Sequence, residues 1–190
     1  MRPVQVLFLE NQDSFSWNVI DRLPVVRSKV QVIAGNDGAA FDRELPRADV
    51  LVIGPGPMDP VRAGLVRAVQ LAAARKLPTL GICLGHQALG MAFGARLART
   101  TPCHGMRESI SFTPSRFFPA FEGPVEVMRY HSLALAEVPP PLSVIARTAE
   151  GLAMAIEHQT LPMAGLQFHP DSYATPRGAE LFDAFFRAVG

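Results

Sequence analysis

One cysteine lies where a chain can expose a nucleophile. Cys83 is the middle residue of Gly81-Ile82-Cys83-Leu84-Gly85, between an apolar run and a segment of helix-forming residues. Glycine-flanked turns from a strand into a helix hold a nucleophile in a tight bend, and the helix N-terminus favours thiolate over thiol. The backbone N–H of Leu84 would face an oxyanion at the attacked carbon. We interpret Cys83 as a nucleophile, although free cysteines are also common as small buried apolar residues.

A thiolate nucleophile needs a base, and His169 is the best placed of the five histidines. It ends the apolar run Gly165–Phe168, and Pro170 keeps it extended, because a residue before proline avoids the helical region. Asp171 comes two residues after His169, close enough to bend back and orient the imidazole. Alone, a His-Pro-Asp turn also fits a capped strand end. Together with Cys83 it predicts a nucleophile, a base and an orienting carboxylate.

The remaining histidines and the second cysteine have weaker claims to function. His86 follows Cys83 by three residues on the same expected helix and would project away from the reactive face, which favours a structural role. His158 has the sequence context of a solvated turn residue. Cys103 is expected in a loop without function, because its neighbour His104 is not accompanied by a second CxxC or HxxxH pair that would indicate a metal site.

A rigid loop follows a third apolar run. Gly54-Pro55-Gly56-Pro57 contains neither GxxxxGK nor GxGxxG, so it is not a phosphate-binding loop. In open α/β sheets ligands bind beyond the carboxyl ends of the strands, and a Gly-Pro-Gly loop there can present a bare backbone N–H. The loop is therefore a candidate for the second oxyanion donor, with a plain turn as the alternative.

Strand and helix patterns alternate in the first half of the chain. Continuous apolar runs indicate strands buried on both faces, and their alternation with helices predicts a parallel sheet with right-handed crossovers. The expected strands are Val4–Leu9, Val30–Ile33, Val50–Ile53 and Leu77–Ile82. The expected helices are Ser14–Leu23 (with Asp13 or Ser14 as N-cap), Gly64–Arg75 and Leu84–Phe93.

The second half has short β-like runs and many of the 17 prolines. We expect antiparallel strands and loops laid over the parallel core. The runs are Ser109–Phe112, Val125–Arg129, Leu142–Arg147, Leu152–Glu157 and Gly165–Phe168, and a closing helix is expected over Arg177–Ala188 with Pro176 near its first position. The predicted fold class is α/β: a single domain over residues 1–190, with a mostly parallel central sheet flanked by helices.

Composition excludes several classes of protein. The chain has 190 residues, 48% of them hydrophobic, and a formal charge of 18 − 17 = +1. That balance argues against disorder, nucleic-acid binding and a polybasic membrane contact. We expect neither a signal peptide nor a membrane span. Two cysteines make no disulfide framework, so we expect a reducing, cytoplasmic location. The charged fraction of 18%, below the usual roughly 25%, is compatible with a partner covering part of the surface.

Taken together, these residues resemble the triad type of class I glutamine amidotransferase. More narrowly, the chain resembles the glutaminase subunit of anthranilate synthase or aminodeoxychorismate synthase, and the NxDSF and RYHSL blocks indicate this chorismate-using branch. The resemblance covers nearly the whole chain in order. Its blocks are Asn11–Phe15, Gly54–Pro57, Gly81–Gln87, His104-Gly105, Arg129–Leu133 and Gln167–Ser172.

The resemblance implies a flavodoxin-like fold and a role for each matching residue. Cys83 would attack the side-chain amide of L-glutamine to form a γ-glutamyl thioester, with His169 moving the protons and Asp171 orienting it. The remaining implied contacts are substrate-binding: Gly56 and Leu84 as oxyanion donors, Pro57 beside them, and Gln87 with the backbone of Ser132 and Leu133 around the glutamine.

The resemblance also implies a partner. Ammonia would pass to a chorismate-aminating synthase subunit, component I, in a heteromeric complex, without nucleic acid or membrane. No cofactor or metal is expected in this chain, and Mg²⁺ is expected only in the partner subunit.

Three positions depart from the family pattern. Asp171 replaces the usual glutamate and is one methylene shorter, so its bond to His169 is expected to be longer. Met58 replaces the last glycine of the oxyanion loop and would be strained if that position requires positive φ. Met106 replaces a lysine in a loop near Cys103 that we expect to face the partner.

These departures leave two alternatives to a glutamine-hydrolysing ammonia donor. One is a catalytically weakened subunit that binds its partner without efficient glutamine turnover. The other is a stand-alone cysteine hydrolase, which Gln87 and the RYHSL block argue against. The sequence does not separate anthranilate, aminodeoxychorismate and related aminodeoxyisochorismate partners.

Overall fold

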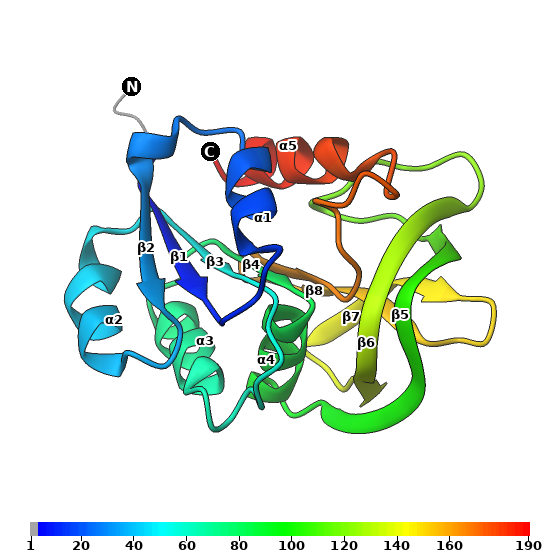
Figure 1. Cartoon of the computed structure of the whole chain (residues 1–190), viewed down its shortest axis with the longest axis horizontal. Coiled ribbons are helices and arrows are strands. Elements are labelled where there is room, and N and C mark those ends of the chain that lie inside the picture. The colour runs from blue at the N-terminus through cyan, green and yellow to red at the C-terminus, as the bar shows by residue number, and fades with distance from the viewer. Residues whose placement is uncertain (1–3) are drawn as a thin grey trace.

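The fold is built on one mixed β-sheet. A computed structural model describes residues 4–190, and within them nine strands form a sheet in the order β2-β1-β3-β4-β9-β8-β7-β5-β6 (Figure 1). The sheet lies between two helical layers. The predicted α/β class with antiparallel additions is therefore confirmed.

Five strands make the parallel half of the sheet. They are β2 (Val30–Ala34), β1 (Val6–Glu10), β3 (Val50–Ile53), β4 (Thr79–Ile82) and β9 (Met163–Leu166). The three central strands β3, β4 and β9 are buried along their whole length, which is why each is a continuous apolar run in the sequence.

Four strands extend the sheet in antiparallel fashion. They are β8 (Ala153–His158), β7 (Leu142–Thr148), β5 (Arg96–Phe112) and β6 (Val125–Glu137). The last two form a long curved ribbon that stands beyond the compact part of the sheet in Figure 1. The ribbon is far longer than the two short runs predicted there, because most side chains of β5 are exposed and leave no apolar run to detect.

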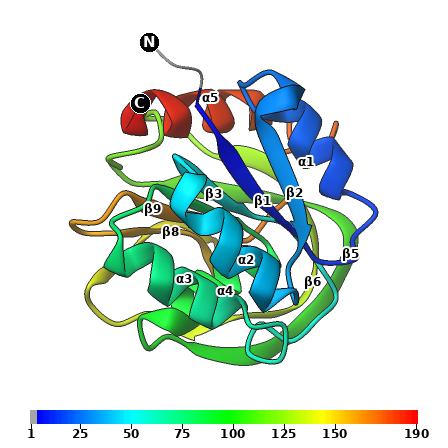
Figure 2. The ribbon, with the colours of Figure 1, turned by 90° about the vertical axis from the view of Figure 1, so that its left-hand side faces the viewer.

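Helices cover both faces of the sheet, as Figure 2 shows. On one side lie α1 (Ser16–Arg22) and α5 (Gly178–Val189), and on the other α2 (Gly38–Glu44), α3 (Leu65–Ala74) and α4 (Leu84–Ala92). Two short 3₁₀ helices span Arg27–Lys29 and Leu45–Arg47. Successive side chains of β1 point to opposite faces of the sheet and so contribute to both cores. Val6 and Phe8 pack with α1 and α5, and Leu7 and Leu9 pack with α2, α3 and α4.

Several predicted boundaries were wrong by a few residues. The helix α1 begins at Ser16, because the Asp13 carboxylate accepts the N–H of Phe15 and forms a turn before the helix instead of capping it. The strands β1 and β4 begin at Val6 and Thr79. Pro176 precedes the N-cap of α5, so it is not in the first helical position.

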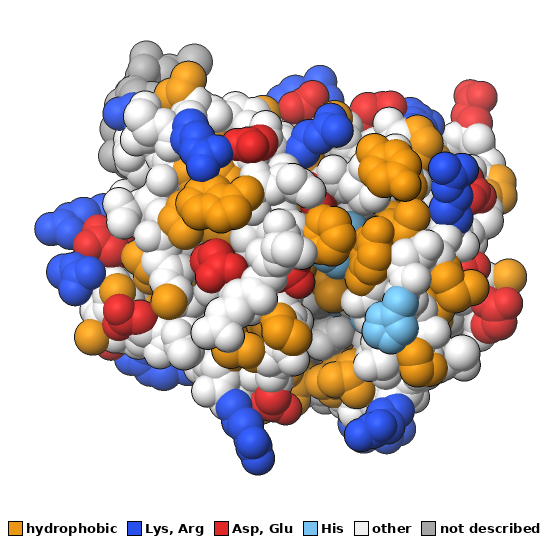
Figure 3. Space-filling model, in the orientation of Figure 1, with side chains coloured by type: hydrophobic (Ala, Val, Ile, Leu, Met, Phe, Trp, Pro, Cys, Tyr) orange, Lys and Arg blue, Asp and Glu red, His pale blue; other side chains and the backbone are white. Residues whose placement is uncertain are grey.

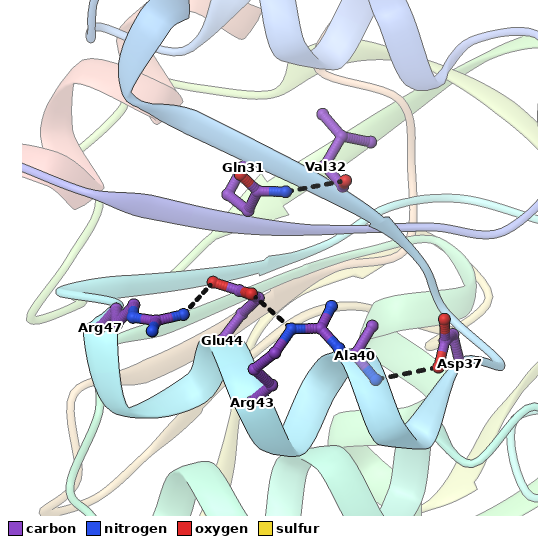
Figure 4. Close-up of polar contacts among 7 residues, drawn as sticks. All are labelled: Gln31, Val32, Asp37, Ala40, Arg43, Glu44 and Arg47. Carbon is purple, nitrogen blue, oxygen red and sulfur yellow. Dashed lines mark hydrogen bonds and ion pairs between the residues drawn. The ribbon is translucent and has the colours of Figure 1, made fainter.

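The helix α2 was not predicted from the sequence. Asp37 begins it by accepting the N–H of Ala40 at 2.9 Å, and Arg43 and Arg47 both donate to the carboxylate of Glu44 (Figure 4). Only Ala40 and Phe41 are buried on this seven-residue helix, so its apolar periodicity is too short to detect. The residues Gly35–Asp37 connect the end of β2 to the start of this helix.

The cap at Asp37 gives a stability test. We expect Asp37→Ala to lower the free energy of unfolding by about 1 kcal/mol, because the Ala40 N–H loses its acceptor. Urea denaturation followed by circular dichroism measures this. Asp42→Ala is the matched control on the same helix, since it removes only an exposed ion pair with Arg67, and exposed ion pairs contribute little to stability. Equal effects of the two substitutions would contradict the capping role.

Candidate active site

Cys83 lies at the junction of β4 and α4 in a strained backbone conformation. Its φ of 51° and ψ of −98° are rarely adopted by residues with a side chain. Its N–H donates to Leu166 O at 2.8 Å, and its carbonyl accepts the Gln87 N–H at 3.1 Å, so both neighbouring elements hold the turn. Strain of this kind at a strand-to-helix turn is typical of an active-site nucleophile.

The two glycines beside Cys83 are needed because backbones pass close to them. A Cβ on Gly81 would lie 2.4 Å from the carbonyl of Gly85, and a Cβ on Gly85 would lie 2.3 Å from Ile53 O. The turn can therefore form against β3 only without these side chains. The glycine spacing that suggested an elbow has this steric reason.

The main chain of His169 is held by hydrogen bonds to a neighbouring strand and to a threonine hydroxyl. Its N–H donates to Met128 O at 3.0 Å, and its carbonyl accepts the Thr175 hydroxyl at 2.8 Å. The same hydroxyl oxygen accepts the Met128 N–H at 3.0 Å. The expectation that His169 ends a strand was wrong, because β9 ends three residues earlier at Leu166. Thr175, whose sequence context indicates only the approach to a helix, positions it instead.

Cys83, His169 and Asp171 are brought together at the carboxyl end of β4 and β9. The Nδ1 of His169 lies 3.4 Å from Asp171 Oδ1, and the sulfur of Cys83 lies close enough to act on the same imidazole. That ion-pair contact is longer than the roughly 2.7–2.9 Å of a strong charge-assisted hydrogen bond. Burial lowers the pKa of His169, but Asp171 and the Cys83 sulfur raise it more, to about 10. The surroundings of His169 therefore favour its protonated form.

Two aromatic rings enclose His169. The ring of Phe15 lies 5.4 Å from the imidazole and that of Tyr130 lies 5.2 Å from it, measured between centroids, and both meet it edge to face. Phe15 and Tyr130 also contact each other at 5.0 Å. They come from α1's N-cap and from β6, far apart in the sequence, so no local pattern could have related them to His169. They limit the access of water to the imidazole.

The Gly54–Pro57 loop lies against the Cys83 turn. The amide of Asn11 donates to Gly54 O at 3.0 Å, and a Cβ on Gly56 would lie 2.5 Å from Asn11 O and 3.0 Å from the side chain of Leu84. Gly56 and Leu84, the two predicted oxyanion donors, are thus neighbours, and Pro57 is exposed beside them. Asn11 pins the loop, a role that the sequence had not indicated.

Met58 is not strained. Its φ is not positive, and its side chain packs partly against the core beneath α3 and α4. The condition under which methionine there would cost energy is therefore absent. Met106, in turn, is exposed on the strand β5 and not in a loop, which corrects the expectation for this segment.

Gln87 joins the predicted substrate-binding backbone to the nucleophile. Its side-chain N–H groups donate to Leu133 O at 3.1 Å and to Gln167 Oε1 at 3.3 Å, and Gln167 in turn donates to Cys83 Sγ at 3.7 Å. Leu133 is half-buried and Ser132 exposed on β6. Gln167 was missed as a site residue, although its place two residues before His169 was a usable signal.

Two residues to which the sequence assigned no catalytic role, His158 and Cys103, lie elsewhere than expected. His158 is buried at the end of β8, where its Nδ1 accepts the N–H groups of Thr160 and Leu161, so it is not a solvated turn residue. Cys103 is buried in β5 opposite His131 and not in a loop. His86 is fully buried, and burial lowers its pKa to about 4. Within residues 4–190 no cluster of His, Cys, Asp and Glu could hold a metal ion.

One face of the molecule has an apolar depression. The face shown in Figure 3 has a depression near its middle, between α4 and the β5–β6 ribbon, and hydrophobic side chains gather around it while charged ones lie mostly at the periphery.

Within the described part of the chain no helix is long and apolar enough to cross a bilayer.

Comparison with known proteins agrees with this geometry. The sequence model of the family "Glutamine amidotransferase class-I" matches residues 7–189. The chain belongs to this family.

The curated relatives differ in length. The chain is 36% identical to anthranilate synthase component 2 of Pseudomonas putida over 193 residues, covering 97% of this chain and 98% of that protein. It is 38% identical to aminodeoxychorismate synthase of Streptomyces griseus, but it spans 26% of the length of that relative. A third relative is aminodeoxychorismate/anthranilate synthase component 2 of Bacillus subtilis, 35% identical over 95% of this chain and 94% of that protein.

Solved structures share the fold. A putative GMP synthase protein from Thermoplasma acidophilum superposes with a TM-score of 0.86 at 20% identity, covering 100% of this chain and 95% of that one. A glutamine amidotransferase from Thermotoga maritima superposes with a TM-score of 0.77 at 15% identity, covering 100% and 97%. At such identities the likeness concerns the fold alone.

Asp171 gives a test through the pKa of His169. Asp171→Asn removes the carboxylate that favours the imidazolium, so we expect the pKa of His169 to fall from about 10 by at least about 1 unit. The imidazole would then lose its proton at a lower pH. An NMR titration of ¹³C-labelled histidine measures the change, with Asp183→Asn on the exposed side of α5 as control. An unchanged pKa in Asp171→Asn would exclude the orienting role.

Gly56 gives a test of the oxyanion loop. Gly56→Ala forces the loop away from Asn11 and Leu84, so we expect kcat for glutamine hydrolysis to fall by about 100-fold, the usual loss for one oxyanion donor. Gly38→Ala is the matched control, because its Cβ would meet no atom within 4 Å. Steady-state ammonia release and circular dichroism measure activity and folding. Full activity in Gly56→Ala would contradict this placement.

Proposed function

We propose that this amidotransferase hydrolyses the side-chain amide of L-glutamine and delivers the ammonia to a separate synthase subunit that aminates chorismate. The observation that carries the proposal is the strained turn that holds Cys83 beside His169, which in turn contacts Asp171. This is the arrangement that a cysteine nucleophile needs at neutral pH.

The first half-reaction releases ammonia. The Cys83 thiolate attacks the amide carbon of glutamine, and the electron pair of the carbonyl moves to its oxygen, which the N–H groups of Gly56 and Leu84 stabilise. The C–N bond then breaks as the His169 imidazolium gives its proton to the leaving nitrogen. The products are ammonia and a γ-glutamyl thioester on Cys83.

The second half-reaction restores the enzyme. Water attacks the thioester carbon while neutral His169 accepts its proton, and the C–S bond breaks to give glutamate and the thiolate. Asp171 stabilises the imidazolium in both halves. The rings of Phe15 and Tyr130 lie edge to face against the imidazole and help to fix its position.

The proposed glutamine pocket uses residues already oriented. Gln87 donates both N–H groups to the protein, so its Oε1 remains free to accept from the α-amino group of the substrate. The backbone of Ser132 and Leu133, with Pro57 across the opening, completes the pocket.

The partner assignment rests on length and likeness. The chain spans almost the whole of relatives named component 2 and about a quarter of a longer relative named aminodeoxychorismate synthase. We propose that the aminating activity belongs to component I of a heteromeric complex. We assign no cofactor to this chain and Mg²⁺ to component I. The two free cysteines fit a cytoplasmic complex.

A weakened, non-catalytic subunit is less well supported. The unstrained Met58 removes one of the two reasons for it. The one remaining reason is the long contact between Asp171 and His169. A longer contact would lower the rate of hydrolysis but would leave the site in place.

The nucleophile gives the test. In the complex with component I, Cys83→Ala should lose glutamine-dependent product formation by more than about 1,000-fold and keep product formation from added ammonia. Cys103→Ser, the other buried free cysteine, should keep both. Component I proteins of the anthranilate and aminodeoxychorismate types, assayed separately, identify the pathway. Glutamine-dependent activity in Cys83→Ala would overturn the proposal.

A further inference from the structure

A buried arginine lies behind the glutamine pocket, outside the residues assigned to catalysis. Arg129 on β6 is 6% exposed, and its Nη1 contacts Glu108 on β5 at 2.6 Å. Its Nε donates to His131 Nε2 at 3.1 Å. The far side of Arg129 and Glu108 lines a cavity of about 610 Å³ between the ribbon and the turn that joins β7 to β8. Glu108 and His131 are therefore the groups that fix the guanidinium.

Arg129 determines which nitrogen of His131 carries the proton. A guanidinium can only donate, so Nε2 of His131 must accept and the imidazole must be neutral with its proton on Nδ1. That Nδ1 lies 2.9 Å from Leu133 O, to which it donates. Burial, followed by the charge of Arg129, lowers the pKa of His131 to about 3, in keeping with a neutral ring.

Hydrogen bonds continue from His131 to the nucleophile. Leu133 O accepts from His131 and also from Gln87, whose second N–H goes to Gln167 Oε1. With its oxygen occupied, Gln167 presents its N–H to Cys83 Sγ at 3.7 Å. In this series of hydrogen bonds, each side-chain amide has one orientation that satisfies its neighbours. A reversed Gln87 would place its oxygen against Leu133 O.

We propose that Arg129 is a positioning residue that acts through His131. By keeping the proton on His131 Nδ1 it holds the Leu133 carbonyl in place, and with it the amides of Gln87 and Gln167 at the glutamine pocket. Glu108 neutralises Arg129. This inference rests on the proposed glutamine hydrolysis. Arg129 does not contact the substrate, so removing it should affect glutamine binding more than the chemical step.

The first test is a double-mutant cycle on glutamine kinetics. Glu108→Gln with Arg129→Met removes the pair without leaving a buried charge alone, and we expect KM for glutamine to rise about tenfold while kcat changes by less than about threefold. His131→Asn should also raise KM. If Arg129 acts through His131, adding the Glu108→Gln/Arg129→Met pair to His131→Asn should cause little further loss. Additive effects, or an unchanged KM in the first variant, would overturn the proposal.

A control on the same ribbon separates this role from general stabilisation. Arg96→Met breaks the exposed cross-strand pair with Glu137, and we expect KM to remain unchanged. Equal increases in KM for both variants would mean that any damage to the ribbon disturbs the pocket, and the positioning role would be overturned.

The second test needs no activity. In ¹⁵N-histidine-labelled protein, His131 should show the Nδ1–H tautomer and stay neutral to pH 5, and Arg129→Lys should retain this more fully than Glu108→Gln/Arg129→Met. An Nε2–H tautomer in the unmodified protein would overturn the proposal even if glutamine hydrolysis were normal. If instead the tautomer is as expected but glutamine is not hydrolysed with either component I, it is the proposed function that fails.

Discussion

The close approach of backbones at the Cys83 turn is the constraint on which the site depends. Gly85 has no Cβ, so α4 can start directly against Ile53 O at the end of β3, and Gly81 gives the same clearance to the helix itself. The packing of three central strands and one helix therefore forces a positive φ on Cys83. The strain is maintained by the core of the protein, and the sulfur is held where two other segments can reach it.

His169 and the oxyanion loop reach that sulfur through long-range contacts. His169 is hydrogen-bonded to β6 through Met128 and to the segment before α5 through Thr175, and the loop is hydrogen-bonded to Asn11 at the end of β1. Sequence patterns singled out Cys83, His169 and Gly56 as candidates, because glycines, prolines and apolar runs mark local geometry. They did not locate Thr175 or Asn11, whose roles arise only when distant strands become neighbours.

The same division explains which parts of the fold were predictable. The strands β3, β4 and β9 are buried on both faces, so their sequences are continuous apolar runs whatever lies next to them. The β5–β6 ribbon is exposed along most of β5, where cross-strand pairing and not burial maintains the structure, and only a fraction of its length was expected. Yet this ribbon supplies Tyr130, Leu133 and the Arg129–His131 pair to the site.

The polar groups of the site are ordered by two residues that have a single hydrogen-bonding role. Asp171, when ionised, can only accept, and it favours the charged form of His169; Arg129 can only donate, and it favours the neutral form of His131. Two buried imidazoles on neighbouring segments are thus driven to opposite protonation states. His169 carries its second proton in the contact with Asp171, and His131 keeps only the Nδ1 proton that it donates to Leu133 O. This difference comes from the partner of each ring, since burial alone would lower both pKa values.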